Sequence, residues 1–221
     1  MKLKHVKKAC QITDQIFHQI IQNFSFKTEK ELANFILKQI KTKGLKPSFP
    51  PIVSSYKNYH DIHHKPKKDL LSRFVIIDFG VKYKGYCSDL TRTVFIGKPK
   101  RKDLKLYQLV IKTQHQTIQK IKISQKYQDL DAYSRKILGS NAKFFRHALG
   151  HGVGRKIHQK PKISRNSKDK IRPGDIITIE PGLYKKNRFG IRIEDTIYIR
   201  KKPQILTKSS KKLFVFPNIY K

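Results

Sequence analysis

The chain has 221 residues, enough for one large domain with a buried core, and carries 50 Lys and Arg against 15 Asp and Glu, a formal net charge of +35. A hydrophobic content of 38% with 10% aromatic residues excludes a disordered chain. No apolar stretch is as long as the roughly 18 residues of a membrane-spanning helix, and the charged N-terminus lacks an apolar core, so the sequence supports neither a membrane span nor a secretory signal.

The two cysteines, Cys10 and Cys87, are too few and too far apart for a disulfide framework or a zinc ribbon. They predict reduced thiols in a cytoplasmic protein. The basic residues are spread over the whole chain, with local clusters only at Lys2 to Lys8 and Lys201 to Lys212. The charge predicts nonspecific contact with nucleic acid or ribosomes, or it reflects a biased composition, and the sequence leaves both interpretations open.

The first part of the chain predicts two helices and then a hairpin. Apolar residues recur at helical spacing over 6–23. Thr28 and Glu31 form the pattern of a capping box, which predicts a second helix that ends near Gly44. Residues 46–66, rich in Pro, Ser, Tyr and His, are typical of a loop. Two strands of a hairpin are then predicted over 74–79 and 86–96.

The second part repeats this order. Helices are predicted over 103–122 and 128–138, and strands over 147–153, 176–180 and 190–199. Each hairpin contains a pair of acids, and the offsets between the two parts are similar, 180 − 78 = 102 and 194 − 89 = 105. We therefore expect one domain, residues 1–221, built from two related halves that close on one site.

In the first hairpin, Asp78 and Asp89 lie in runs that should be buried. A two-residue turn at Tyr83–Lys84 places them opposite each other, and a turn at Lys84–Gly85 places them diagonally, on the same face in either case. Two buried carboxylates that are close together repel and lose hydration, so a cation is expected between them. The apolar flanks favour a divalent metal ion over a lysine.

The second hairpin contains Glu180 and Glu194, two of only four glutamates in the chain. They face each other if the loop between them centres on Asn187. Just before this hairpin, "HALGHGVGRKIH" places His147, His151 and His158 among glycines, which allow positive φ and close approach to a ligand.

Each of these residues alone could be a hydrogen-bonded structural group or a turn residue. Their joint occurrence favours a metal site, because four carboxylates with one imidazole suit two Mn, Fe, Co or Zn ions that share bridging acids. Arg192 lies two residues before Glu194, so it shares the same strand face. We expect it to orient a metal-bound carboxylate, although it could also be a surface arginine.

The sequence is identified as a member of the M24 metallopeptidases on five segments in order. These are "SFPPIVSSYKNYHDIHHKP", "DFGVKYKGYCSDLTRT", "HALGHGVGRKIHQKP", "TIEPGLY" and "GIRIEDT". The resemblance covers nearly the whole chain. It implies the pita-bread α/β (α+β) fold, a curved antiparallel sheet backed by two pseudosymmetric helix pairs.

The resemblance also implies which residues form the site. The implied metal ligands are Asp78, Asp89, His151, Glu180 and Glu194, with Asp89 and Glu194 bridging two ions. Catalytic or substrate-binding roles are implied for His63, His147 and His158, and His63 fits the substrate-side position better than His60 or His64. Mn²⁺ is the favoured ion, with Co²⁺, Zn²⁺ and Fe²⁺ as alternatives.

"GYCSDLTRT", "EPGLY" and "GIRIEDT" resemble the Xaa-Pro aminopeptidase and prolidase branch, as does His147, four residues before His151. Two departures stand out. The chain begins at the first helix of the catalytic domain, without the N-terminal domain of most proline-specific members, which leaves oligomeric state and part of substrate selection open. Gln159 replaces the acid that usually follows the histidine at His158, which weakens the support for that residue.

We therefore predict an exopeptidase that hydrolyses the N-terminal peptide bond, expected to be Xaa-Pro, through a hydroxide bridging two metal ions, with Glu180 as proton shuttle. The peptide is the expected partner. One alternative is a methionine aminopeptidase. Another is a non-catalytic RNA- or ribosome-binding member of the fold, which the intact ligand set disfavours.

Overall fold

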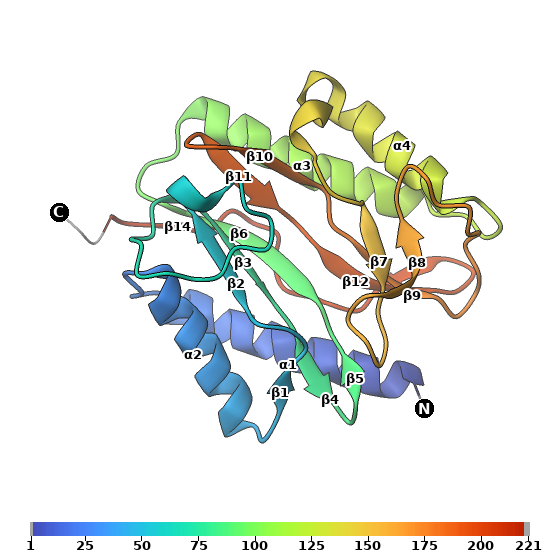
Figure 1. Cartoon of the computed structure of the whole chain (residues 1–221), viewed down its shortest axis with the longest axis horizontal. Helices are drawn as coiled ribbons and strands as arrows, with labels where there is room; N and C mark the ends of the chain where they lie inside the picture. The colour runs from blue at the N-terminus through green and yellow to red at the C-terminus, as the bar shows by residue number, and fades with distance from the viewer. Residues whose placement is uncertain (1, 219–221) are drawn as a thin grey trace.

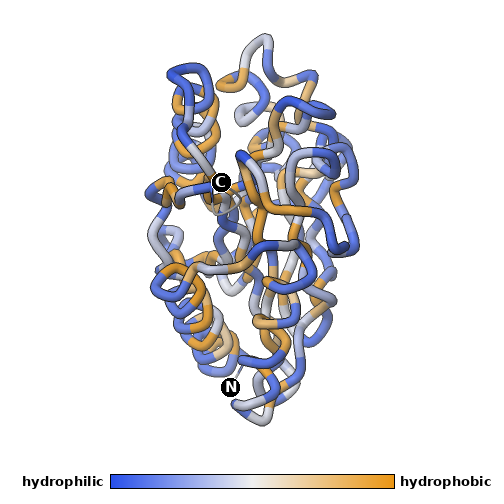
Figure 2. Tube along the Cα trace, turned by 90° about the vertical axis from the view of Figure 1, so that its left-hand side faces the viewer, coloured by the Kyte–Doolittle hydropathy of each residue, from blue (hydrophilic) through white to orange (hydrophobic). Residues whose placement is uncertain are grey.

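The computed structural model describes residues 2–218. In Figure 1, one pair of helices lies below the strands and a second pair lies above them. Within this range, no helix combines the length and apolar character needed to cross a membrane. The helical coils in Figure 2 show hydrophobic and hydrophilic residues in alternating bands, as expected for helices that pack one face against a sheet.

The first half consists of α1 (Lys2–Gln22), α2 (Glu29–Thr42) and a four-stranded sheet. The sheet has the order β14-β6-β3-β2, formed by Val215–Phe216, Leu90–Ile96, Arg73–Phe79 and Ile52–Ser55. At the start of α2, Thr28 accepts a hydrogen bond from Glu31 N at 3.1 Å, as the sequence predicts. The Glu31 carboxylate accepts from Lys27 N rather than from Thr28 N. The apolar faces of both helices and the sheet form one buried core.

The second half has the same plan. Helices α3 (Arg101–Lys120) and α4 (Tyr127–Leu138) pack on a five-stranded sheet. Its order is β13-β12-β9-β7-β8, formed by Pro203–Ile205, Asp195–Ile199, Ile176–Ile179, Gly150–Gly152 and Gln159–Ile163. The four predicted helices are thus confirmed, with ends that differ by a few residues.

The remaining elements are short. Strands β1 (Lys46–Pro47), β4 (Val81–Tyr83) and β5 (Tyr86–Cys87) form a three-stranded sheet, and β10 (Gly182–Lys185) pairs with β11 (Phe189–Arg192). Two 3-10 turns, η1 (Tyr56–Asn58) and η2 (Gly139–Phe144), follow β2 and α4.

The expectation of a loop over 46–66 was wrong, because this stretch contains β1, β2 and η1. Strand β2 is only four residues long and is buried along its whole length. It therefore shows no alternation of polar and apolar residues, and its neighbouring prolines and serines conceal it. The predicted strands over 86–96 and 190–199 are each interrupted, at Ser88–Asp89 and at Ile193–Glu194.

The two halves meet where β6 lies beside β11. Thr93 Oγ1 donates to Arg192 O at 2.9 Å, and Glu194 N donates to Thr91 O at 3.1 Å. These bonds hold the interruption at Glu194 against the middle of β6. The acids of both halves are therefore brought to one place.

Candidate metal centre

The strand register places the two acids of each half. In the first hairpin, Tyr83 pairs with Tyr86 across the turn Lys84–Gly85, and Asp78 pairs with Thr91. Asp78 and Asp89 are therefore diagonal neighbours on one face, the second of the two predicted arrangements.

In the second half, Asp195 pairs with Ile179, and Gly182 pairs with Arg192. Both pairs have the register that centres the loop on Asn187, as predicted. Glu180 and Glu194 face each other at the gap between these two ladders, where neither residue belongs to a strand. This interruption frees their backbones from the regular ladder.

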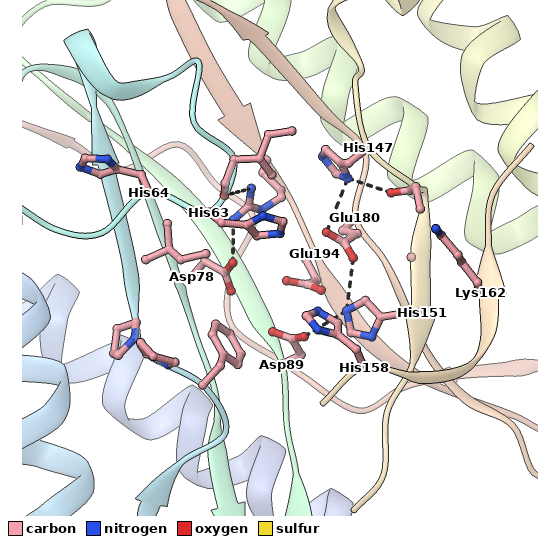
Figure 3. A pocket seen from close by; sticks show the side chains of 18 of the residues that line it. His63, His64, Asp78, Asp89, His147, His151, His158, Lys162, Glu180 and Glu194 are labelled. Atoms are coloured by element: carbon pink, nitrogen blue, oxygen red, sulfur yellow. Dashed lines mark hydrogen bonds and ion pairs between the residues drawn. The ribbon is translucent and has the colours of Figure 1, made fainter. Parts of the chain in front are cut away.

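The side chains converge on one cavity (Figure 3). Ligand atoms of Asp89, His151 and Glu194 all lie within 4.8 Å of one another, a spacing that could hold a metal ion. His151 Nε2 is 3.4 Å from Asp89 Oδ2 and 3.4 Å from Glu180 Oε1. Asp78 approaches from the neighbouring strand, so all five predicted ligands line the same cavity.

Two observations show that these residues fit a cation. Oδ1 of Asp78 and Oδ1 of Asp89 are buried and have no hydrogen-bond partner among the described residues. Buried carboxylate oxygens without partners are costly, and a metal ion would satisfy them. The other ring nitrogen of His151, Nδ1, lies 3.1 Å from Gly152 O, the contact typical of a metal-binding histidine whose Nε2 is left for the ion.

Burial and neighbouring charges shift the pKa values of the candidate ligands. Burial raises the pKa of Asp78 to about 6 against the lowering effect of Arg192. Burial likewise raises the pKa of Glu180 to about 7, and burial together with Asp89 raises the pKa of Glu194 well above its usual range. For His151, burial lowers the pKa, but the carboxylates of Asp89 and Glu180 outweigh it and raise the pKa to about 9. A divalent cation would restore the ionised carboxylates and the neutral imidazole.

Arg192 lies beside these ligands, where the sequence placed it. Its guanidinium is 2% exposed and donates to Asp78 Oδ2 at 2.6 Å and to the Tyr184 hydroxyl at 2.9 Å. The same hydroxyl is 2.8 Å from His147 Nε2. A chain of contacts thus connects Asp78 to His147 through Arg192 and Tyr184.

The histidines are placed differently from one another. His63, His147 and His158 line the cavity, as does His64. His60 does not, and its Nδ1 lies 3.1 Å from Lys57 O. His64 is 3% exposed, and its Nε2 lies 2.7 Å from the carboxylate of Glu29. His63 is exposed at the cavity, without the buried contact that holds His64.

The glycines around His151 serve a purpose other than positive φ, since Gly150, Gly152 and Gly154 all have ordinary negative-φ or extended backbones. A Cβ on Gly150 would lie 2.1 Å from Thr178 O, and one on Gly152 would lie 2.3 Å from Lys160 O. Gly150 and Gly152 are therefore required for close packing of β7 between its neighbours.

The cavity has a volume of about 720 Å³. Besides the candidate metal ligands, its lining includes the apolar side chains of Phe49, Pro51, Ile62 and Pro66. This combination of a few convergent charged groups with apolar surface is typical of a site for a small organic molecule.

Sequence reasoning missed several residues that support the site. Thr91 Oγ1 donates to Glu194 Oε2 at 2.6 Å, and Thr178 Oγ1 donates to Glu180 Oε1 at 3.1 Å. Arg135 donates to the carbonyl oxygens of Phe145 and His147, at 2.7 Å and 2.9 Å, and so fixes the backbone before His151. Thr91 and Thr178 could have been found from strand alternation with the neighbouring acids, whereas no sequence signal indicates Arg135.

Comparison with known proteins points to the same family that the sequence motifs resemble. The model of metallopeptidase family M24 matches residues 4–201. A Xaa-Pro dipeptidase from Pyrococcus horikoshii is 34% identical over 96% of this chain and 62% of its own length. A putative Xaa-Pro aminopeptidase from Mycoplasma genitalium is 35% identical over 96% of this chain and 63% of its own length.

Solved structures of a prolidase and of an X-Pro aminopeptidase share the fold of this chain. The prolidase from Pyrococcus horikoshii matches with a TM-score of 0.92 and 33% identity, over 96% of this chain and 63% of that chain. The X-Pro aminopeptidase from Thermotoga maritima also matches with a TM-score of 0.92, at 30% identity, over 97% of this chain and 63% of that chain. These matches confirm the expected pita-bread fold. The chain spans about three fifths of the length of the relatives it matches.

Proposed function

The chain belongs to metallopeptidase family M24, and we propose that it is a dinuclear-metal exopeptidase that hydrolyses the N-terminal Xaa-Pro bond of peptides. The observation that supports this most directly is the convergence of Asp89, His151 and Glu194 within 4.8 Å, beside a buried carboxylate oxygen of Asp78 that has no partner among the described residues. The relatives named Xaa-Pro dipeptidase and Xaa-Pro aminopeptidase favour the proline branch over a methionine aminopeptidase.

Asp78, Asp89, His151, Glu180 and Glu194 would hold two divalent ions, with Mn²⁺ as the first candidate. When bound, the ions would supply the Lewis acidity that generates a nucleophile from water near neutral pH and polarises the peptide carbonyl. Asp89 and Glu194 would take the positions shared by the two ions, because they are the two carboxylates of the cluster and each has two oxygens, whereas the third member, His151, has one free ring nitrogen.

Glu180 would move the proton. Its Oε1 lies 3.4 Å from His151 Nε2, its Oε2 lies 3.8 Å from His147 Nδ1, and it faces the cavity. A carboxylate in this position is suited to accept a proton from the attacking water and to pass it to the leaving amine.

The cavity histidines would bind the substrate. Burial, with Arg192 nearby, lowers the pKa of His147 to about 3, so its ring is neutral; its Nδ1 lies 2.7 Å from Ala148 O and its Nε2 lies 2.8 Å from the Tyr184 hydroxyl, which fixes the ring in the cavity wall without adding charge. Burial and the neighbouring His151 lower the pKa of His158. The ring of His63 lies on the opposite side of the cavity from His151, a position from which it could contact the residue after the scissile bond (Figure 3).

The test is cleavage of Ala-Pro, Ala-Pro-Ala and Met-Ala-Ser by Mn²⁺-loaded protein, with a chelated sample as control. The proposal expects chelator-sensitive cleavage of the proline peptides alone, and the dipeptide separates a prolidase from an aminopeptidase. Asp89→Asn should abolish turnover, whereas Asp129→Asn, a change of an exposed aspartate on α4, should not. Cleavage of Met-Ala-Ser alone would reassign the protein to the methionine branch.

A further inference from the structure

Glu29 is a buried acid far along the sequence from the metal ligands. It is the first residue of α2, its side chain is 0% exposed, and it is one of four glutamates in the chain. The proposed mechanism assigns it no role. A buried carboxylate is tolerated only when its oxygens are paired or hydrogen-bonded, so its contacts are informative.

Each carboxylate oxygen of Glu29 has two hydrogen-bond partners. Oε1 accepts from Ser55 N and from Asn58 Nδ2, each at 2.9 Å. Oε2 accepts from Lys67 N at 3.1 Å and lies 2.7 Å from His64 Nε2. The four partners all belong to residues 55–67, and they include both ends of this segment.

The substrate-side histidine lies inside that segment. His63 lines the cavity, while its neighbour His64 contacts Glu29. Figure 3 shows the two rings pointing in different directions, His63 towards Asp78 and His64 away from it. Because the two residues are adjacent, the contact that fixes His64 also holds the backbone from which His63 projects.

The rest of α2 strengthens this attachment. The N–H groups of Glu29 and Lys30 donate to the carbonyl oxygens of Asp69 and Lys67, at 3.1 Å and 2.8 Å, so the N-terminus of α2 binds the last residue of the segment and the chain just after it. From the other half of the protein, Arg146 donates to His60 O at 3.0 Å.

We propose that Glu29 is a positioning residue for substrate binding: with His64, it holds residues 55–67 so that His63 faces the metal-centre cavity. This inference rests on the proposed function, since it gives His63 a substrate to contact. It assigns the two adjacent histidines separate roles, one towards the cavity and one as an internal attachment.

Glu29→Gln tests the attachment with little change in size. Gln replaces one of the two carboxylate oxygens with an NH₂ group. If the NH₂ takes the place of Oε1, the backbone N–H of Ser55 loses its acceptor, and if it takes the place of Oε2, the backbone N–H of Lys67 loses its acceptor. We expect KM for Ala-Pro-Ala to rise about tenfold, kcat to change less than about threefold, and Mn²⁺ affinity measured by titration calorimetry to remain unchanged.

The chain offers a matched control two residues away. Glu31 is an exposed glutamate in the same first turn of α2, and its carboxylate accepts from Lys27 N without contacting residues 55–67. Glu31→Gln should lower the melting temperature slightly and leave KM unchanged. A second pair of variants covers the case in which Glu29→Gln fails to fold. His64→Gln keeps a donor at the Nε2 position and should resemble the wild type, whereas His64→Ala should raise KM.

Hydrogen exchange provides a readout that does not depend on turnover. In Glu29→Gln, the amide of Ser55 or of Lys67, whichever loses its acceptor, should exchange at least about tenfold faster, and amides in β6 should not change. Unchanged exchange in the variant, or a KM that rises no more than in Glu31→Gln, would overturn the proposal. If the wild type cleaves no Xaa-Pro peptide, the proposed function fails, and the exchange rates still decide whether Glu29 holds the segment.

Discussion

Glu180→Gln should raise the stability of the metal-free protein and reduce the stability that Mn²⁺ adds, because it removes a proposed metal ligand. Glu180 is mostly buried, and its pKa is raised from 4.5 to about 7 by burial. A carboxyl group with a raised pKa contributes stability at low pH, and this contribution is lost as the pH rises through about 7. Glutamine has nearly the same shape and never ionises, so the variant avoids that loss. It also removes a metal ligand and the proposed proton acceptor.

The size of the effect follows from the shift. A change from 4.5 to about 7 corresponds to about 3 kcal/mol of lost stability once the pH exceeds 7. The carboxylate also helps to raise the pKa of His151 to about 9, and losing this attraction offsets part of the gain. We expect the metal-free variant to be about 1–3 kcal/mol more stable than wild type at pH 8, or roughly 3–8 °C higher in Tm, and less than about 1 kcal/mol more stable at pH 5.

The assay is thermal unfolding of chelated protein at pH 5 and pH 8, followed by the same scans with Mn²⁺. Asp78→Asn is the comparison, since it also removes a ligand. It should gain less stability at pH 8 than Glu180→Gln, because the removal of a carboxylate whose pKa is raised to about 6 is offset by the loss of the group to which buried Arg192 donates at 2.6 Å. If metal-free Glu180→Gln melted below wild type at pH 8, or if its advantage were equal at both pH values, the assignment of the raised pKa to burial would be wrong.

Three further predictions concern metal, backbone and substrate. Mn²⁺ should raise the wild-type Tm more at pH 8 than at pH 5. Asp78 and Glu180, with pKa values of about 6 and about 7, must lose their protons before they can bind the ion. An equal rise in Tm at both pH values would argue against carboxylate ligands. Gly150→Ala should cost more than about 2 kcal/mol in urea unfolding, because its Cβ would lie 2.1 Å from Thr178 O. His63→Asn should raise KM for Ala-Pro-Ala about tenfold, whereas His60→Asn, outside the cavity, should not; equal KM values would contradict the assignment of His63.

Residue patterns within single segments of the sequence predicted much of the fold and of the candidate site. Helix periodicity identified α1, α2, α3 and α4, since burial of one helix face imposes a repeat that is visible in a single segment. The acids were equally visible, because Asp78 and Asp89 interrupt apolar runs in a chain with few acids. The period of two along a strand then placed Asp78 on the same face as Asp89, and Glu180 opposite Glu194, before any tertiary contact was known.

Only the tertiary structure decided which turn joins the first hairpin, that β2 exists, and how the halves meet. Strand β2 is stabilised by pairing with β3, a contact between residues more than 20 positions apart, for example Val53 with Ile77. The hydrogen bonds from Glu29 to residues 55–67 likewise connect positions 26 to 38 residues apart. Such contacts depend on how separate segments fold against one another, and that arrangement leaves no periodic trace in the sequence. The sequence by itself therefore determined which chemical groups the site contains, and the packing of the two halves determined how those groups are held.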